Sequence, residues 1–380
     1  MERDILEAMA AEVDPYLSEL AEFVALDTPS DDPQAVGRLL DLLAPRLADL
    51  GATVRRPQAD VLDAGFGATD AGHVLLLLHA DTVFGHGEAA RRPLRVDGGR
   101  AYGPGVADMK GGIALMLWVL RLATRAGRRA AGLRVLVTGD EETGAERSAQ
   151  QIERAAAGAR AALVLEPGRE SGAVVSARKA VGSFRLEAAG IEAHAGVEPW
   201  RGASAVHELA RRVAAIADLS ERIPGLHVNV GRIEGGTRAN VVAGAANCLI
   251  DVRVLRQRDM AAAQELLAEA ALAAADPKVA LRLLGGFTGP PMEKTAATEL
   301  LLAHARAAAQ AIALPLEDVA TGGGSDGNRV AAQGVPVLDG LGPVGGRAHS
   351  DDEFLEIASV APRAALLAGI LVRLGAFGPI

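Results

Sequence analysis

The chain has 380 residues, of which 49% are hydrophobic and 23% charged, so it can bury a large core and form two domains. Its formal net charge of −9 argues against nucleic acid or an anionic membrane as a partner. The single cysteine, Cys248, excludes an internal disulfide framework and a cysteine-based metal cluster. Residues 1–35 are too acidic and too poor in apolar runs for a signal peptide, so we expect a soluble cytoplasmic protein.

Residues 1–150 alternate between helical and strand-like hydrophobic patterns, and the stretch that follows repeats the form. Apolar residues recur at helical spacing over 37–52, where the helix ends at Gly51, and again over 116–127. Apolar runs in "VLLLLHAD", "LRVLVTGDEETG" and "ARAALVLEPG" predict three buried strands. Strands separated by helices predict an α/β fold, a mostly parallel sheet with helices on both faces.

Each of these three strands ends on side chains that can bind a metal. Ligands of a parallel sheet bind outside the carboxyl ends of its strands, so this coincidence indicates a functional site. His79 and Asp81 also point to the same side, because side chains alternate along an extended chain. The candidate side chains at the three ends are His79 and Asp81, then Asp140, Glu141 and Glu142, and finally Glu166.

A different pattern begins near residue 177. Strand, helix, strand, strand, helix and strand follow one another up to residue 289, in the order of a ferredoxin-like α+β unit. Asp259 is placed to cap the second of these helices. We therefore predict a smaller lid or dimerisation domain at 177–289, inserted into a catalytic metal-binding domain made of 1–176 and 290–380.

The chain then returns to the first domain. The pattern predicts a helix at 295–312, a glycine-rich turn in "GGGSDG", a short strand in "VPVLDGLG" and a last amphipathic helix at 356–374. Between the strand and this helix, "AHSDDEF" contains His349.

Imidazole and carboxylate groups are the ligands that a divalent metal such as zinc prefers. Besides the strand ends, Asp108 in "YGPGVADMKGG" and His349 offer such groups. Each feature alone has a purely structural explanation. The pair Glu141-Glu142 could be a solvated loop, Asp108 could cap the next helix, and His349 could be a surface residue. His86, in the loop after Asp81, is interpreted as a loop histidine. The joint pattern favours a metal site.

Several ordered motifs carry a resemblance that covers nearly the whole chain. They are "LLLHAD", "AYGPGVADMKGG", "GDEETGA", "LEPG", "EAHAGVEPWRGASA", "GGTRANVVA", "DVRV", "GGGSDG" and "AHSDDE". With these motifs the chain resembles the co-catalytic dinuclear zinc exopeptidases and deacylases. That family includes carboxypeptidase G, acetylornithine deacetylase, succinyl-diaminopimelate desuccinylase and the aminoacylases. The inserted lid domain also matches the architecture of the family.

The resemblance implies a role for each residue of the site. Asp108 would bridge two divalent metals, zinc most readily, with cobalt or manganese as alternatives. His79 and Glu166 would complete the shell of one metal, and Glu142 and His349 that of the other. Glu141 would be the general base for a metal-bridging water, and would return the proton to the leaving amine. Asp81 would orient the ring of His79.

The same resemblance assigns functions to the inserted domain. Arg253 in "DVRV" lies on the polar face of its strand, where it would face solvent or bind a substrate carboxylate. Asn240 would contact the substrate, and His194 would reach the partner's active site in a homodimer that associates through the lid domains. The backbone of Gly323, Gly324 and Ser325 would bind the substrate on the catalytic side.

Two readings of another class remain open at this stage. "GGGSDG" contains the pattern Gly323-x-Ser325-x-Gly327 of a serine nucleophile, with Asp339 and His349 as the triad partners in the required order. The half-polar stretch before Ser325 argues against it. A non-catalytic relative that only binds an amino acid or peptide is the other reading, but it would be expected to lose ligands.

Two further residues narrow the substrate class that the resemblance implies. Glu166, where other members carry Asp, and Pro104, where many carry Arg, resemble the carboxypeptidase G branch. We therefore expect release of a C-terminal amino acid, glutamate first, from an N-acyl or short peptidyl substrate. The alternative within the family is an N-acyl-amino-acid deacylase with the same chemistry.

Overall fold

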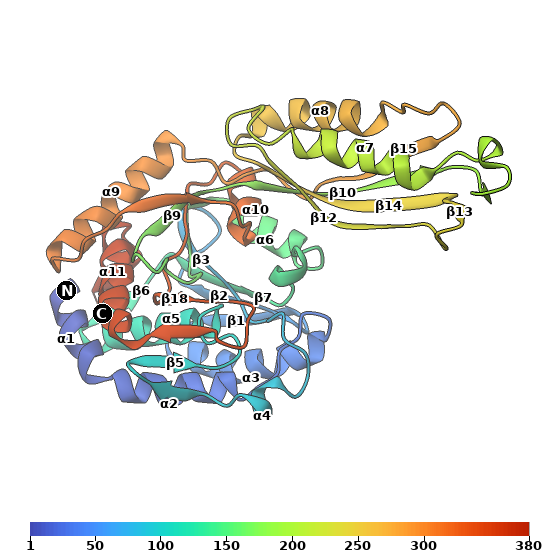
Figure 1. Ribbon diagram of the computed structural model, residues 1–380. Helices are drawn as coiled ribbons and strands as arrows, with labels where there is room; N and C mark the ends of the chain where they lie inside the picture. Colours follow the sequence, from blue (N-terminus) through green and yellow to red (C-terminus); the bar gives the residue numbers. More distant parts are fainter. Residues whose placement is uncertain (380) are drawn as a thin grey trace. The chain divides into compact units, whose positions relative to one another are not determined.

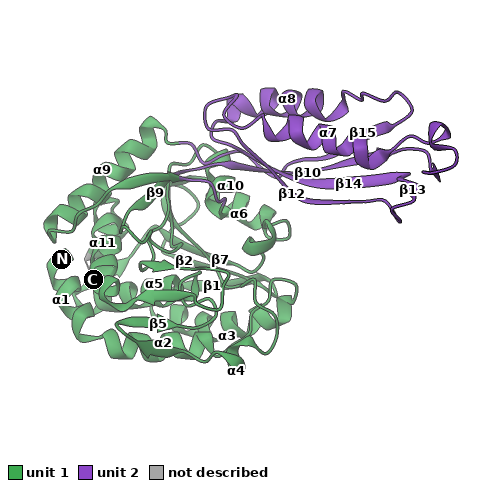
Figure 2. Cartoon of the chain, in the orientation of Figure 1, with its two compact units in different colours: residues 1–176, 294–320, 325–380 green, residues 177–293, 321–324 purple. Residues whose placement is uncertain are grey.

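The computed structural model describes residues 1–379, and these form two compact units with separate hydrophobic cores (Figures 1 and 2). Unit 2 consists of Ala177–Glu293 and Thr321–Gly324, and unit 1 is the rest. The sequence placed the second boundary at 289/290. In the structure, residues 290–293 and the loop 321–324 pack with unit 2 instead.

Unit 1 is built on a six-stranded sheet. Four neighbouring strands, β7, β3, β8 and β17, run parallel, and β1 and β2 form an antiparallel hairpin at the edge. The predicted mostly parallel sheet is therefore confirmed, although the hairpin was not anticipated. In sheet order the strands are β1 (Thr53–Gln58), β2 (Val61–Phe66), β7 (Leu133–Thr138), β3 (His73–His79), β8 (Ala159–Val164) and β17 (Val337–Leu338).

Helices cover this sheet on both faces. The connection from β3 through α5 to β7 runs one way along the sheet, and that from β7 through α6 to β8 runs the other way. Because such crossovers are right-handed, α5 and α6 lie on opposite faces, and all seven residues of β3 are buried. The helices of unit 1 are α1 (Glu2–Ala11), α2 (Val13–Val24), α3 (Pro33–Asp49), α4 (Glu88–Arg91), α5 (Lys110–Arg125), α6 (Ala149–Ala156), α9 (Ala296–Ala311), α10 (Asp326–Ala332) and α11 (Val360–Arg373).

Helix α5 begins at Lys110, six residues before the predicted start at 116. The apolar period did not reveal this first turn because it contains Gly111 and Gly112. A Cβ atom at Gly112 would lie 2.3 Å from the carbonyl oxygen of Leu165, so only glycine lets the helix pack this closely on the end of β8. The turn brings the loop before α5 close to Glu166, which follows Leu165.

A second, small sheet in unit 1 joins distant parts of the chain. Its order is β18 (Gly345–Gly346), β19 (Phe354–Glu356), β5 (Arg100–Tyr102) and β4 (Arg95–Asp97), with antiparallel pairing throughout. The pairing of β19 with β5 places the segment before residue 354 beside the segment after residue 102. Two-stranded sheets add β6 (Arg128–Ala130) with β20 (Phe377–Pro379), and β9 (Val174–Arg178) with β16 (Asp318–Thr321).

Unit 2 has the predicted β-α-β-β-α-β order. Its antiparallel sheet runs β12-β14-β10-β15, as in ferredoxin-like folds, with α7 and α8 packed on it. Asp259 occupies the N-cap of α8, but its carboxylate makes no capping hydrogen bond. The elements are β10 (Ala180–Ala189), β11 (Ala193–His194), α7 (Ala205–Ala217), β12 (His227–Gly235), β13 (Val241–Val242), β14 (Ala245–Val254), α8 (Met260–Leu272) and β15 (Ala280–Phe287).

Candidate metal centre

The carboxyl ends of β3, β7 and β8 deliver the predicted ligands to one edge of the main sheet. β3 ends at His79, which is paired in register with Thr138 at the end of β7. Beyond β7, the short 3-10 helix η1 (Glu141–Thr143) carries two acids, and Glu166 follows β8 after one residue. Because the strands are parallel and adjacent, their ends place these side chains together.

Asp108 lies between two imidazoles. Its Oδ1 is 3.0 Å from Nε2 of His79, and its Oδ2 is 3.4 Å from Nε2 of His349. Each imidazole faces one further carboxylate: His79 lies 3.5 Å from Glu166, and His349 lies 2.9 Å from Glu142. The structure therefore brings all five predicted ligands together, in two sets that share Asp108.

The donor set fits divalent cations. The ligand atoms of His79, Asp108 and Glu142 lie within 4.8 Å of one another, and so do those of His79, Glu141 and Glu166. Imidazole nitrogen and carboxylate oxygen suit zinc, cobalt and manganese. Glu141 thus lies among the ligands, close enough to act on a group bound by them.

Buried negative charge accumulates at this site. Burial and the nearby Asp108 raise the pKa of Glu166 to about 8. Burial raises the pKa of Glu141 well above its usual range, and that of Glu142 is raised as well. Hydrogen bonds with Asp108 and Glu142 raise the pKa of His349 to about 10. Carboxylates held this close together repel one another, and a bound cation would relieve that repulsion.

Asp81 organises the surroundings of both His79 and Glu141. Nδ1 of His79 lies 3.1 Å from the backbone oxygen of Asp81 and 3.4 Å from its carboxylate. The same carboxylate accepts the backbone amides of Glu141 and Glu142, each at 3.2 Å, and the hydroxyl of Ser30 at 2.7 Å. Asp81 therefore fixes the loop of the predicted base as well as the imidazole. Ser30 was missed, because nothing in its local sequence distinguishes it.

Two other acids near the strand ends have different environments. Asp140 accepts the backbone amides of Arg147 and Ser148 and belongs to neither group of ligand atoms, so it organises the loop. Asp326, which the sequence did not single out, is buried and accepts the hydroxyl of Thr138 at 2.7 Å. Burial raises the pKa of Asp326 to about 7.

Asp108 and His349 do not have the purely structural roles that the sequence left open. The N-cap of α5 is Met109, and no side chain caps that helix, so Asp108 is not its cap. His349 is 52% exposed, yet its imidazole faces two carboxylates. His86 lies in a loop, 59% exposed and 3.1 Å from Asp32.

Ser325 caps a helix. Its hydroxyl donates to Asp339 at 2.7 Å and accepts the amide of Gly327 at the start of α10. Within residues 1–379, no histidine is hydrogen-bonded to Ser325, and His349 faces Asp108 and Glu142 instead. The serine-nucleophile reading therefore lacks its base.

In unit 2, two of the predicted residues are neighbours. His194 pairs with Val241 in the short β11–β13 ladder, and the amide of Ala195 donates to the carbonyl of Asn240. Both His194 and Asn240 are exposed. The segments 235–239 and 241–243 beside them line a pocket of about 480 Å³.

Arg253 is less free than the sequence suggested. Its guanidinium makes two 2.8 Å contacts with Asp251, because residues two apart on a strand share a face. It also donates to the carbonyl of Gly322. The carbonyls of Gly323 and Gly324 accept hydrogen bonds from Arg178.

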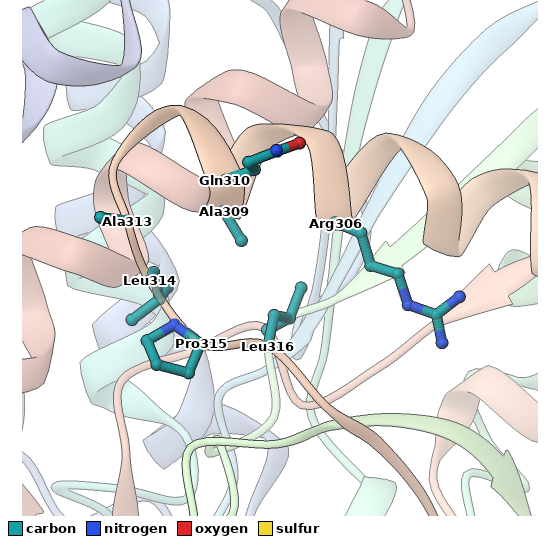
Figure 3. Close-up of a pocket in the computed structure, with 7 residues that line it drawn as sticks. All are labelled: Arg306, Ala309, Gln310, Ala313, Leu314, Pro315 and Leu316. Carbon is teal, nitrogen blue, oxygen red and sulfur yellow. The ribbon is translucent and has the colours of Figure 1, made fainter.

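Another pocket, of about 470 Å³, lies in unit 1 at the end of α9 (Figure 3). Arg306 is the only charged residue that lines it, and its guanidinium is paired with Asp318 and Glu299. This pocket holds no cluster of ligands. Its walls are formed by Arg306, Ala309, Gln310, Ala313, Leu314, Pro315 and Leu316.

Among residues 1–379, no helix has the length and apolar content needed to cross a membrane.

Comparison with known proteins gives consistent matches. The sequence model of peptidase family M20/M25/M40 matches residues 75–373. Carboxypeptidase G2 of Pseudomonas sp. strain RS-16 is 30% identical, over 98% of this chain and 92% of the relative. N-acetyl-L-citrulline deacetylase of Xanthomonas campestris is also 30% identical, over 90% and 94%. The crystal structure of aminopeptidase PepT from Bacillus cereus has a TM-score of 0.83 and 23% identity, over 96% of this chain and 99% of that one.

Added zinc should raise the unfolding midpoint more at pH 8 than at pH 6. The pKa of Glu166 is raised to about 8 in the folded protein, so protonation of Glu166 stabilises the metal-free protein. This stabilisation is fully present below the usual pKa of a glutamate and is lost as the pH rises to 8. The raised pKa of His349 acts in the same direction up to about 10. Metal binds the deprotonated groups, so it restores more stability at higher pH. Thermal unfolding with and without zinc at both pH values measures this, and an equal or smaller effect at pH 8 would contradict it.

Proposed function

The chain belongs to peptidase family M20/M25/M40, and from this premise we propose that it is a dinuclear metal-dependent hydrolase that cleaves an amide bond. The substrate is an N-acyl amino acid or short peptide, and the released C-terminal amino acid is glutamate in preference to others. The observation that carries the proposal is the position of Asp108, whose two oxygens face two imidazoles, each with its own further carboxylate.

Two divalent cations, most favourably zinc, would be held by these side chains. His79 and Glu166 form one set and Glu142 and His349 the other, with Asp108 common to both. When bound, such a pair of cations supplies an activated water and polarises the scissile carbonyl.

Glu141 is the general base of this proposal. Its carboxylate lies among the ligands, and burial raises its pKa well above the usual range, as suits a group that accepts and releases a proton. It takes the proton of the attacking water and gives it to the leaving amine. Asp81 holds the backbone of Glu141 and the ring of His79, so it keeps base and ligand in fixed positions.

The proposal also gives roles to residues of unit 2. We assign substrate binding to Asn240 and Arg253, together with the backbone of Gly323, Gly324 and Ser325. His194 stabilises the oxyanion in the active site of a second copy, within a homodimer that forms through unit 2. In support, His194 and Asn240 are exposed and held together by the β11–β13 ladder. Arg253 would exchange its contact with Asp251 for the substrate carboxylate.

The preference for glutamate rests on resemblance to the carboxypeptidase branch. Glu166 and Pro104 follow that branch, and the chain aligns with carboxypeptidase G2 over 98% of its length. A deacylase that frees an acyl group from an amino acid is the second candidate. It is supported by the equal identity, 30%, to N-acetyl-L-citrulline deacetylase. The chemistry at the metals is the same in both cases.

Replacing Glu141 with Gln should abolish turnover, because the base is lost while the metal ligands remain. We expect activity to fall by at least about 10²-fold, the usual contribution of a general base. Metal content, measured by elemental analysis, should stay near two ions per chain. Glu146→Gln is the matched control, since Glu146 is an exposed acid of the same loop. More than a few per cent residual activity would rule out the assignment.

The substrate class is tested with a panel of N-acyl amino acids and dipeptides and the zinc-loaded enzyme. We expect fastest release from substrates that end in glutamate, and loss of activity with a chelator but not with a serine-directed reagent.

Arg253→Ala should lower kcat/KM by about 10-fold or more, since a charge-assisted hydrogen bond is lost. Arg185→Ala on β10 is the control.

In the substrate panel, fastest release from acetylated amino acids would instead favour the deacylase. Purified protein that binds no metal would favour a non-catalytic relative.

The role of His194 across a dimer can be tested by mixing two inactive variants. A heterodimer of His194→Ala and Glu141→Ala subunits contains one site with both an intact base and the partner's intact His194. Each heterodimer should therefore show up to about half of the activity of a wild-type dimer, because one of its two sites is intact. Purified heterodimers of His227→Ala and Glu141→Ala subunits give the reference activity of one intact site, because His227 is an exposed histidine of β12. Confirmed heterodimers without any recovery would disprove action in trans.

A further inference from the structure

Glu353 is a buried carboxylate that the proposed mechanism leaves without a role. Its side chain is only 1% exposed. It accepts three backbone amides: that of Gly105 at 3.0 Å on Oε2, and those of Ala107 at 2.9 Å and Asp108 at 3.0 Å on Oε1. One side chain thus holds three amides of a single loop, including the amide of Asp108 itself.

The small sheet explains how this contact arises. β19 pairs with β5 so that Phe354 lies opposite Tyr102. In an antiparallel pair, the residue before Phe354 must therefore lie beside the residues after Tyr102. Those residues form the loop that ends in Asp108, and four residues before Glu353 stands His349. Glu353 therefore lies at the end of the β5–β19 ladder, where the segment that carries Asp108 and the segment that carries His349 separate.

Burying this carboxylate costs free energy, and the three hydrogen bonds from the loop amides offset that cost. The buried Lys110 interacts electrostatically with Glu353, but no ion pair joins them in the described residues 1–379. The loop that it holds, Gly103 to Ala107, has no side chain able to form a hydrogen bond. The loop amides would be left without an acceptor if Glu353 were absent.

The other side of the same turn is held from outside. Arg91 of α4 makes two 2.9 Å contacts with Asp351, and Arg92 donates to the carbonyl of Ser350. The turn that carries His349 is therefore fixed to α4 by its exposed side and to the Asp108 loop by Glu353. Only the second of these connections joins two ligand segments to each other.

We propose that Glu353 is a positioning residue that sets Asp108 relative to His349, so that both metals can be bound at once. The inference rests on the proposed function, since it needs a two-metal site. Glu353 belongs to neither cluster of candidate ligand atoms. It fixes the backbone from which the bridging carboxylate extends, and partners of this kind typically change metal affinity by about 10–100-fold.

The test is cobalt binding to Glu353→Gln, followed by the visible spectrum and by equilibrium dialysis. Glutamine keeps one acceptor oxygen but turns an NH₂ group toward the loop amides, so at least one of the three loses its acceptor. We expect affinity for the second ion to weaken by about 10–100-fold and the cobalt spectrum to change. Glu353→Asp retains the charge but is one carbon shorter, and should give an intermediate affinity. It also serves if the glutamine variant does not fold.

The matched control is Glu356→Gln, at the last residue of β19, three residues after Glu353. Glu356 pairs with Arg100 outside the site, so its replacement removes the same charge without touching the loop. If Glu353 were only a structural brace, its variants would lower the unfolding midpoint of the metal-free protein. Cobalt affinities and spectrum, measured well below that midpoint, would stay at wild-type values, and this result would overturn the proposal. If the wild-type protein itself binds fewer than two ions, the proposed function fails instead.

Discussion

Asp108 has to present its two carboxylate oxygens to two different imidazoles, and much of unit 1 follows from that requirement. One imidazole, His79, comes from a strand whose seven residues are all buried, and the other, His349, from a turn near the end of the chain. The loop between β5 and α5 must therefore be held from both sides. Glycines at 111 and 112 let α5 pack on the end of β8, and the β5–β19 ladder brings in the later segment. Packing and pairing together set the position of a single side chain.

The same edge of the sheet concentrates negative charge that the fold alone does not neutralise. Glu141, Glu142 and Glu166 are drawn together because β7 and β8, the strands that they follow, run parallel on either side of β3, and burial raises the pKa of each. Such a cluster destabilises the protein without a cation, and a bound cation would remove this cost. Asp81 keeps the arrangement specific, since it ties the backbone of two of these acids to the ring of His79.

The sequence predicted those parts of the site that follow from periodicity. His79 and Glu166 were found because apolar runs end at them. The proposed bridging role of Asp108 required the resemblance to a family, since glycine-rich loops have no periodicity to read. Ser30 and Glu353 were missed because their partners lie 51 or more residues away and become neighbours only when strands pair. Helix α5 was predicted too short for a related reason, because its glycines are chosen for close approach and not for helical propensity.

The ligands are also distributed unevenly along the chain, on the two sides of the inserted unit 2. In a chain that emerges from the ribosome N-terminus first, His79, Asp108 and Glu166 are available long before His349 and its neighbour Glu353. Unit 2 has its own core and can close in the interval. The candidate metal centre can therefore be completed only after the two halves of the discontinuous unit 1 have packed together, so a bound metal would report that packing.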